Sequence, residues 1–310
     1  MSTRSRAAFV GLGAIGTPMA RHVAAITSLS VWNRTRSRAA QFAAETGARD
    51  ATSPADAATD VEFFITCLPT SAEVESILFG PGSAGNGAPD GAAAQLKPGA
   101  IVIDCTSGDP ATSRRTAGRL AARDIGFIDA PVSGGVIGAE QAKLTVMVGG
   151  DSDTLERARP ILESFAGKLV HCGAVGTGDA VKAINNALLA VHVWSTAEGL
   201  ATLSKLGVDP AVALDVINSS SGRSNSSINL FPERVLNRSF PRTFRLALLD
   251  KDARIAAAIA EQTGTPADIL ALTSRLFAEA HAELGEDADH VEAVKVVEQR
   301  AGVEISGGTR

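Results

Sequence analysis

A glycine-rich turn near the start of the chain limits its possible folds more than any other feature. Residues 9–16 read FVGLGAIG, which fits the pattern G-x-G-x-x-G, and they join a strand-like run to a helical pattern. In that setting Gly11 permits the tight turn, Gly13 lets a pyrophosphate approach the backbone, and Gly16 allows close helix–strand packing. The N–H groups at the helix N-terminus favour bound phosphate. We therefore expect a dinucleotide site here; its residues are Gly11, Leu12, Gly13, Ala14, Ile15 and Gly16.

Short apolar runs alternate with helical patterns through the first half of the chain. Such alternation indicates βαβ units, and continuous apolar runs indicate strands that are buried on both faces. We therefore expect an α/β Rossmann domain with a doubly wound, mostly parallel sheet. The runs expected to form strands are Ala7–Gly11, Leu29–Asn33, Val61–Leu68, Ala100–Cys105, Gly126–Ala130, Leu144–Gly149 and Lys168–Cys172. The stretch Pro81–Gly99, rich in Gly, Ala and Pro, is expected to be a surface loop.

The pattern changes after Gly176, beyond which we find no convincing strand. A long helical pattern, Asp179–Leu206, is followed by shorter ones at Pro210–Asn218, Leu246–Thr263, Pro266–Leu284 and His290–Ala301. We expect an NAD(P)-binding Rossmann domain over residues 1–174. An all-helical domain for substrate binding and oligomerisation should follow over residues 175–310, joined to the first domain by the long helix.

The composition and the cysteine content give no indication of a nucleic-acid, membrane or metal partner. The 310 residues carry a net charge of −5, with no basic stripe that would indicate nucleic-acid binding. The sequence contains no run of about 18 apolar residues, so no membrane span is expected. Met1–Arg6 is too short and polar for a signal peptide. Three cysteines without a pairing pattern are expected to be small buried hydrophobes in a reducing compartment, so we expect a cytoplasmic protein. No His, Cys, Asp and Glu set has metal-ligand spacing, so no metal is expected.

The end of the second expected strand bears on the choice of cofactor. NAD sites commonly place a carboxylate there, against the ribose hydroxyls, but here Asn33, Arg34 and Thr35 follow the strand. Arg34 supplies a charge and a fork of donors for a 2′-phosphate. The sequence therefore favours NADP over NAD. The alternative is that Arg34 only stacks on the adenine and both cofactors bind.

Three further clusters carry candidate chemistry. Ser133, Gly134 and Gly135 directly follow a strand and could cradle a carboxylate, although an ordinary glycine turn has the same composition. Lys182 and Asn186 lie four apart on one helix face among apolar neighbours. Burial there would lower the lysine pKa and suit it to proton exchange with a substrate hydroxyl, whereas a lone helix lysine is ordinarily solvated. Lys251 stands between two aspartates, which also fits a charged helix start.

The clusters form an ordered set: GLGAIGTPMA, DCTSGDP, DAPVSGG, GTGDAVKAINN and LLDKD. As a set they resemble the 3-hydroxyacid dehydrogenase family, from Phe9 to about Ala301. That family includes 3-hydroxyisobutyrate dehydrogenases, tartronate semialdehyde reductases and glyoxylate/succinic semialdehyde reductases. It is related to 6-phosphogluconate dehydrogenase.

The resemblance implies roles for individual residues. Lys182 matches the family's catalytic lysine, and Asn186 matches the asparagine that orients the substrate beside it. Ser133, Gly134 and Gly135 match the substrate-carboxylate site. The positions that match the cofactor-lining segment and the nicotinamide region are Leu68, Pro69, Thr106 and Lys251, the last of which also reaches the substrate.

We therefore expect an oxidoreductase that transfers a hydride between NADP, or NAD, and a small 3-hydroxyacid or the matching semialdehyde or oxoacid. An imine reductase of the same architecture and a non-catalytic NADP-binding protein are the alternatives. Members of both classes typically lack the lysine, so Lys182 counts against them. The resemblance and the alanine-rich run Ala253–Ala260 indicate a homodimer or homotetramer. The polar segment Ser219–Ser227 is either a surface loop or a lining of the substrate pocket.

Overall fold

The computed structural model describes residues 4–80 and 91–307. The chain divides into two compact units, Met1–Lys182 and Ala183–Arg310. The domain boundary expected from the sequence lies after residue 174, just ahead of the long helix, and the division between the two units falls within that helix. Within the described ranges, no helix is long and apolar enough to cross a membrane.

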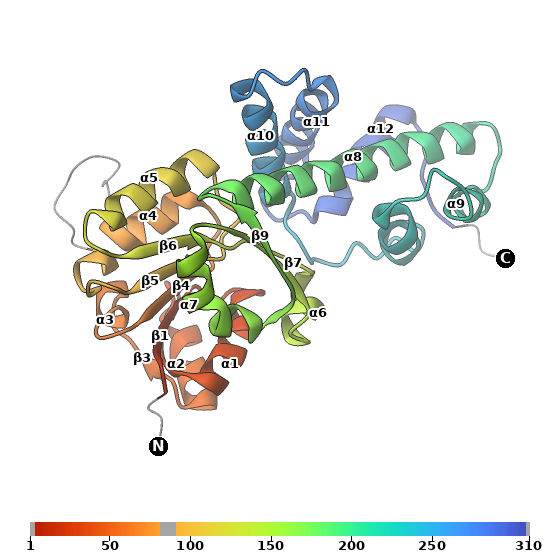
Figure 1. Ribbon diagram of the computed structural model, residues 1–310. Coiled ribbons are helices and arrows are strands. Elements are labelled where there is room, and N and C mark those ends of the chain that lie inside the picture. Colours follow the sequence, from red (N-terminus) through yellow and green to blue (C-terminus); the bar gives the residue numbers. More distant parts are fainter. Residues whose placement is uncertain (1–3, 81–90, 308–310) are drawn as a thin grey trace. The chain divides into compact units, whose positions relative to one another are not determined.

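A single sheet forms the centre of the first unit (Figure 1). Its strands in the described part of the chain are β1 (Arg6–Val10), β2 (Ser28–Trp32), β3 (Arg49–Asp50), β4 (Phe63–Thr66), β5 (Ile101–Asp104), β6 (Gly126–Asp129), β7 (Val132–Ser133), β8 (Leu144–Gly149) and β9 (Ala166–Gly173). Their order is β3-β2-β1-β4-β5-β6-β8-β7, with β9 paired to β8. The first six are parallel, and among the described strands of this sheet only the pairings of β8 with β6 and β7 are antiparallel. The doubly wound, mostly parallel sheet expected from the sequence is confirmed.

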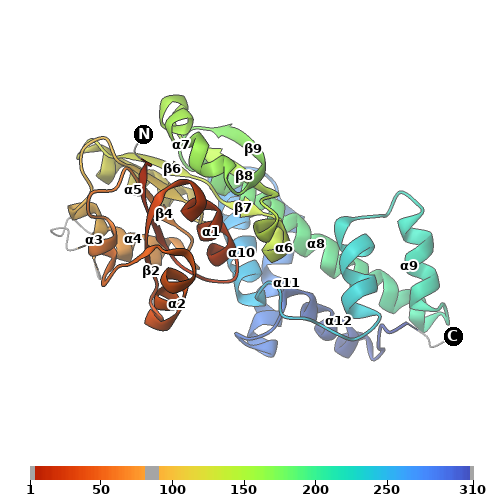
Figure 2. The same cartoon turned by 90° about the horizontal axis from the view of Figure 1, so that it is seen from below.

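Helices cover both faces of this sheet. They are α1 (Gly16–Ile26), α2 (Arg36–Thr46), α3 (Pro54–Ala57), α4 (Ser71–Phe79), the 3₁₀ helix η1 (Ala92–Ala94), α5 (Pro110–Ala121), α6 (Gly135–Glu140) and α7 (Ser152–Glu163). Side chains alternate along a strand, so Phe9 and Ile65 pack with α1, α2, α6 and α7 on one face, while Val10 and Phe64 pack with α3, α4 and α5 on the other. Figure 2 shows α1 and α2 together on the first of these faces.

Some local expectations need correction. The two-residue strands β3 and β7 were not expected, because a run of two residues carries no periodicity. Of the expected loop Pro81–Gly99, residues 81–90 lie outside the described residues, and the remainder contains η1. Among the cysteines, Cys105 is buried in the core, whereas Cys67 and Cys172 are only partly buried.

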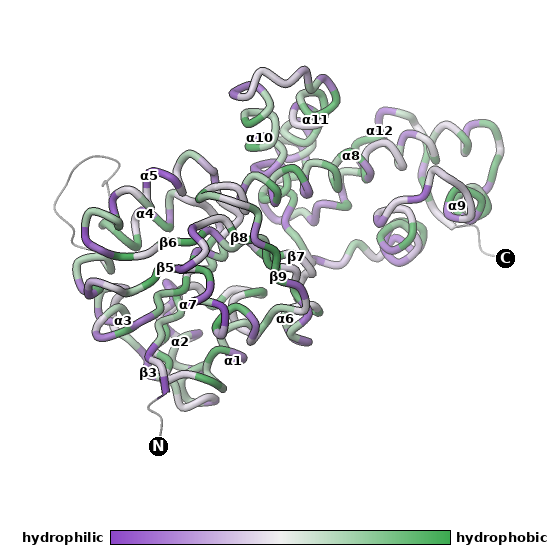
Figure 3. The backbone as a smooth tube through the Cα atoms, in the orientation of Figure 1, coloured by the Kyte–Doolittle hydropathy of each residue, from purple (hydrophilic) through white to green (hydrophobic). Residues whose placement is uncertain are grey.

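The second unit is built from helices. They are α8 (Thr177–Lys205), which begins in the first unit, then α9 (Pro210–Asn218), the π-helix η2 (Ser226–Val235), α10 (Leu246–Gln262), α11 (Asp268–Leu284), the 3₁₀ helix η3 (His290–Glu292) and α12 (Ala293–Ala301). Their core includes Trp194, Phe231 and Phe277. Hydrophobic and hydrophilic residues alternate along α10 and α11 in Figure 3, as expected of amphipathic helices. The helical second part expected from the sequence is confirmed.

The polar segment Ser219–Ser227 is not a simple surface loop. Its last residues, Ser226 and Ser227, are fully buried and begin η2, while Arg223 and Asn225 are exposed. Three alanines of the expected apolar face at Ala253–Ala260 are buried, namely Ala253, Ala256 and Ala260. The alanines therefore do not by themselves require a second subunit.

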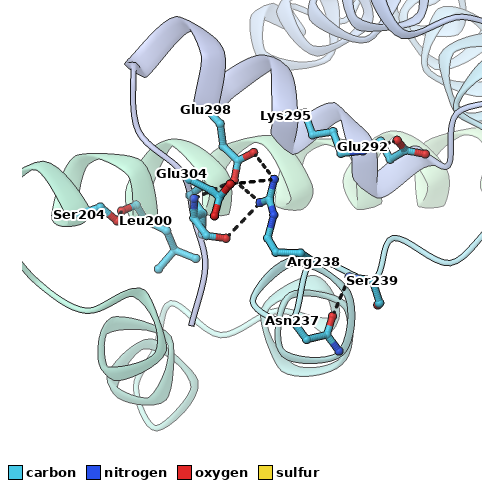
Figure 4. A network of polar contacts seen from close by, with 10 residues as sticks. Leu200, Ser204, Asn237, Arg238, Ser239, Glu292, Lys295, Glu298 and Glu304 are labelled. Carbon is cyan, nitrogen blue, oxygen red and sulfur yellow. Dashed lines mark hydrogen bonds and ion pairs between the residues drawn. The ribbon is translucent and has the colours of Figure 1, made fainter. Parts of the chain in front are cut away.

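An ion pair joins α12 to the segment after η2 (Figure 4). Arg238 donates from both terminal nitrogens to the nearly buried carboxylate of Glu298, and the backbone N–H of Ile305 donates to the same carboxylate at 2.7 Å. Arg238 has a φ of +60°, a strained value for a residue other than glycine. These contacts join Arg238, Glu298 and Ile305 within the second unit.

Candidate active site

The fingerprint turn has the backbone that its glycines allow. Gly11 has a φ of +104°, and a Cβ there would lie 2.2 Å from the carbonyl oxygen of Cys67. A Cβ on Gly16 would lie 2.0 Å from the carbonyl oxygen of Gly11, so the start of α1 needs glycine to pack on the turn. A Cβ on Gly13 would meet no protein atom within 4 Å. The turn is therefore closed on the protein side and open at the position where a pyrophosphate is expected.

Asn33 braces this turn through both polar atoms of its side-chain amide. Its Oδ1 accepts a 3.0 Å hydrogen bond from the N–H of Leu12, and its Nδ2 donates to the carbonyl oxygen of Thr35 at 3.1 Å. The residue thus joins the fingerprint to the end of β2. Sequence position alone did not reveal this role, because it depends on where the two turns meet.

A hollow of about 450 Å³ adjoins the fingerprint. Leu12, Gly13 and Ala14 line it together with Arg38, which lies in the first turn of α2. Both Arg34 and Arg38 are exposed, whereas Arg36 between them bonds to Asp50 and the carbonyl oxygen of Ala51. Arg38 is a further candidate for binding the 2′-phosphate, and it was not expected from the sequence. Its position four residues after Arg34 could have indicated it.

The ends of β4 and β5 bring together two residues expected near the nicotinamide. The N–H of Leu68 donates to the Oγ1 of Thr106 at 3.1 Å. Thr106 is fixed in turn by Asp104, whose Oδ1 accepts from its N–H at 3.0 Å and from the hydroxyl of Thr66 at 2.8 Å. Burial raises the pKa of Asp104 to about 6, against the opposing effect of these hydrogen bonds.

The glycines after β7 adopt a backbone that favours glycine. Gly134 and Gly135 have φ values of +139° and +66°, and Ser133 immediately precedes them at the end of β7. A Cβ on Gly134 would lie 3.0 Å from a methyl group of Leu144. An ordinary glycine turn would show the same features, so the carboxylate-binding role of this segment stays a prediction.

Two buried carboxylates hold the start of α8. Asp129, at the end of β6, accepts hydrogen bonds from the N–H groups of Gly176 and Asp179 at 2.7 and 2.9 Å. Asp179 accepts from the N–H of Gly108 at 2.9 Å and from the hydroxyl of Ser113 at 2.6 Å. Lys182 follows in the next turn of the same helix and is only 8% exposed. The candidate lysine is therefore a buried side chain on a firmly held helix.

In the second unit one carboxylate contacts two candidate residues. Asn186 donates from its Nδ2 to the Oδ2 of Asp252 at 2.6 Å, and the Nζ of Lys251 lies 3.1 Å from the Oδ1 of Asp252. The neighbouring carboxylate of Asp250 instead contacts Arg254 and His281. Asp252 was missed because its contact with Asn186 spans 66 positions of the sequence.

The predicted residues fall into local groups. In the first unit, Leu12 and Asn33 lie together at the fingerprint, and Leu68 lies with Thr106. Lys182 and Asn186 share a helix face by their spacing of four. Among the described residues, no group of three or more His, Cys, Asp or Glu could hold a metal ion.

Comparison with known proteins covers nearly the whole chain. Residues 6–173 match the family model described as the NAD binding domain of 6-phosphogluconate dehydrogenase. Residues 176–297 match the NAD-binding domain of NADP-dependent 3-hydroxyisobutyrate dehydrogenase.

Individual relatives have closely similar lengths. The 2-(hydroxymethyl)glutarate dehydrogenase of Eubacterium barkeri is 33% identical over 97% of each chain. The 3-hydroxyisobutyrate dehydrogenase of Pseudomonas aeruginosa is 35% identical, over 91% of this chain and 93% of its own. The solved structure of 3-hydroxyisobutyrate dehydrogenase from Mycobacterium tuberculosis with L-serine has a TM-score of 0.83 and 30% identity, and covers 95% of this chain and 99% of its own.

Proposed function

The chain belongs to the 3-hydroxyacid dehydrogenase family, as an NAD(P)-dependent oxidoreductase, and we propose that Lys182 is its general acid and base. The observation that carries this proposal is the burial of Lys182 on a helix whose N-terminus is held at the end of β6. A buried amine has a lower cost of becoming neutral than a solvated one. A neutral Lys182 accepts the proton of a substrate hydroxyl in oxidation, and its ammonium form returns a proton to the carbonyl oxygen in reduction.

The fingerprint fits a dinucleotide, because the turn is open at Gly13 and closed by backbone at Gly11 and Gly16. Its N–H groups would hold the pyrophosphate, and Leu68 and Thr106 would border the nicotinamide. When bound, this cofactor accepts or supplies the hydride. Of the two forms we propose NADP, with Arg34 and Arg38 facing the 2′-phosphate. Both side chains are exposed, whereas Arg36 between them bonds to Asp50 and to the carbonyl oxygen of Ala51.

The substrate that fits these groups is a small 3-hydroxyacid. The Ser133–Gly135 segment would hold the carboxylate, and Asn186 would hold the hydroxyl or carbonyl oxygen beside Lys182. Asp252 supports this arrangement, because it fixes one N–H of the Asn186 amide and lies next to the Lys251 ammonium group. The relatives named above act on small hydroxyacids according to their names, which supports the same class.

Turnover with a panel of substrates tests the proposal. The panel contains 3-hydroxyisobutyrate, L-serine, tartronate semialdehyde and succinic semialdehyde, each with NADP and NAD in the required redox state, together with a cyclic imine and NADPH. Turnover of one or more hydroxyacids or semialdehydes, and none of the imine, is expected. Turnover of the imine alone would indicate an imine reductase. NADP binding without turnover of any compound would indicate a non-catalytic protein.

A further inference from the structure

The two carboxylates at the start of α8 do more than satisfy a helix end. Asp129 and Asp179 are 0% and 1% exposed, and burying a carboxylate is costly unless hydrogen bonds compensate it. Asp129 accepts from the N–H groups at the N-terminus of α8, which joins the helix to the end of β6. Asp179 accepts from Gly108 and Ser113, which joins the first turn of α8 to the segment after β5 and to α5.

Three glycines lie so close to these carboxylates that a side chain at any of the three positions would crowd a carboxylate oxygen. A Cβ on Gly149 would lie 2.5 Å from the Oδ1 of Asp129, and one on Gly178 would lie 2.8 Å from its Oδ2. A Cβ on Gly108 would lie 3.0 Å from the Oδ2 of Asp179. Backbone thus packs directly against both carboxylates, and at Gly178 that backbone is the first turn of α8.

We infer that Asp179, supported by Asp129, is a positioning residue that sets the place of Lys182 relative to the segment Thr106–Gly108. Lys182 comes three residues after Asp179, about 4.5 Å along the helix axis at 1.5 Å per residue. Gly108, which donates to Asp179, comes two residues after Thr106, the residue expected beside the nicotinamide. One carboxylate therefore links the helix that carries the proton-transferring group to the segment that borders the hydride carrier. This inference rests on the proposed role of Lys182.

The chemical consequence follows from geometry. Proton and hydride transfer must act on the same carbon–oxygen group of the substrate, so Lys182 and the nicotinamide need a fixed separation. A misplacement of about 1 Å can lower a rate about 100-fold. Loss of Asp179 should therefore lower kcat and leave cofactor binding at the fingerprint unchanged.

The test compares variants of the full-length protein. In Asp179→Ala both hydrogen bonds are lost, and we expect kcat to fall about 10- to 100-fold with the Kd for NADP changed by less than about twofold. In Asp179→Asn the amide oxygen still accepts from Gly108 and the amide nitrogen can donate to Ser113, so kcat should stay within about threefold of the wild-type value. The milder Ser113→Ala removes one hydrogen bond and provides a second variant if Asp179→Ala does not fold.

A kinetic isotope effect separates positioning from general damage. Partial unfolding lowers the active fraction but leaves the isotope effect and the pH profile unchanged, whereas a misplaced lysine makes the chemical step slower. With substrate deuterated at the reacting carbon, we expect Asp179→Ala, or Ser113→Ala in its place, to show a larger isotope effect on kcat than the wild type. The control Asp151→Ala, which loses the N-cap of α7 in the same unit, should keep the wild-type isotope effect. An unchanged isotope effect and pH profile in the Asp179 and Ser113 variants would overturn the inference.

A second readout does not need turnover. The rate at which an amine-reactive reagent modifies Lys182, followed by mass spectrometry, reports the exposure and protonation of that lysine in the cofactor-free protein. We expect Asp179→Ala, or Ser113→Ala if that variant does not fold, to change this rate at least threefold relative to the exposed Lys168. An equal rate in wild type and variant would contradict the positioning role. If the wild type turns over no compound of the panel but the modification rate changes as expected, the proposed activity fails, and only the structural part of the inference, that Asp179 sets the place of Lys182, stands.

Discussion

Asn186 of α8 donates a 2.6 Å hydrogen bond from its side-chain amide to the carboxylate of Asp252 in α10. The same carboxylate lies 3.1 Å from the ammonium group of Lys251. Two residues assigned to the substrate by resemblance are thus held by a third that had no assignment. Asp252 is 1% exposed, so its contacts are protected from competing water.

Removal of this carboxylate should impair substrate handling. In Asp252→Ala, Asn186 loses its hydrogen-bond acceptor and Lys251 loses the carboxylate that lies 3.1 Å from its ammonium group. We expect kcat/KM for the hydroxyacid to fall about 10- to 100-fold, because hydrogen bonds to charged groups contribute about 1.5–3 kcal/mol. Asp250→Ala is the matched control, since that carboxylate contacts Arg254 and His281. It should lower the thermal stability but change kcat/KM less than threefold, and equal losses in the two variants would argue against a role for Asp252.

Arg34 and Asn33 should affect the cofactors differently. Arg34→Ala removes a cation expected at the 2′-phosphate, so the Kd for NADP should rise tenfold or more while the Kd for NAD changes little. Asn33→Ala removes the brace between Leu12 and β2, so both affinities should fall by the same factor. Fluorescence titration with both cofactors measures the four constants. Equal weakening of NADP and NAD by Arg34→Ala would show that Arg34 does not select the phosphate.

The buried carboxyl of Asp104 should make stability depend on pH. Burial raises its pKa from 3.8 in an unstructured chain to about 6, so the folded state binds its proton more tightly than the unfolded state. The resulting stability is present below about pH 4 and is lost as the pH rises through about 6. Asp104→Asn keeps an acceptor oxygen for Thr66 and Thr106 but does not titrate.

The stability of the Asn variant relative to the wild type should therefore increase from pH 4 to pH 7. The size of this change should be on the order of 2 kcal/mol, since one pKa unit corresponds to about 1.4 kcal/mol. Urea unfolding of both proteins at pH 4 and at pH 7 provides the comparison. A difference that is the same at both pH values would show that Asp104 titrates normally.

The protein should form a dimer or a larger oligomer. The buried alanines of α10 do not by themselves support an oligomer. Exposed apolar side chains on the second unit do favour an oligomer, namely Leu188, Leu206, Val216, Ile269 and Leu272. Light scattering at micromolar concentration should give at least twice the chain mass of 31.8 kDa. Leu188→Gln and Ile269→Gln should lower that mass if those faces form the interface, and a monomeric wild type would contradict the expectation.

The sequence predicted those features that depend on local patterns. The central strands could be recognised because Phe64 and Ile65 are both buried, one on each face of the sheet, which gives a continuous apolar run. The glycines of the fingerprint could be recognised because their spacing follows from the turn itself.

The remaining features depend on contacts between distant parts of the chain. The contact of Asn186 with Asp252 and that of Ser113 with Asp179 each join residues 66 positions apart, and no periodicity encodes such a pair. The bracing role of Asn33 was equally hidden, since its position after β2 suits a phosphate ligand and a turn brace alike.

The turnover of Lys182→Ala tests the central claim most directly. The variant should be assayed with the best hydroxyacid of the panel, and its Kd for NADP should be measured in the same preparation. We expect kcat to fall about 10²- to 10⁴-fold, the usual contribution of a general acid and base, while the Kd for NADP changes less than about threefold. A variant that keeps wild-type kcat would contradict the assignment of proton transfer to Lys182.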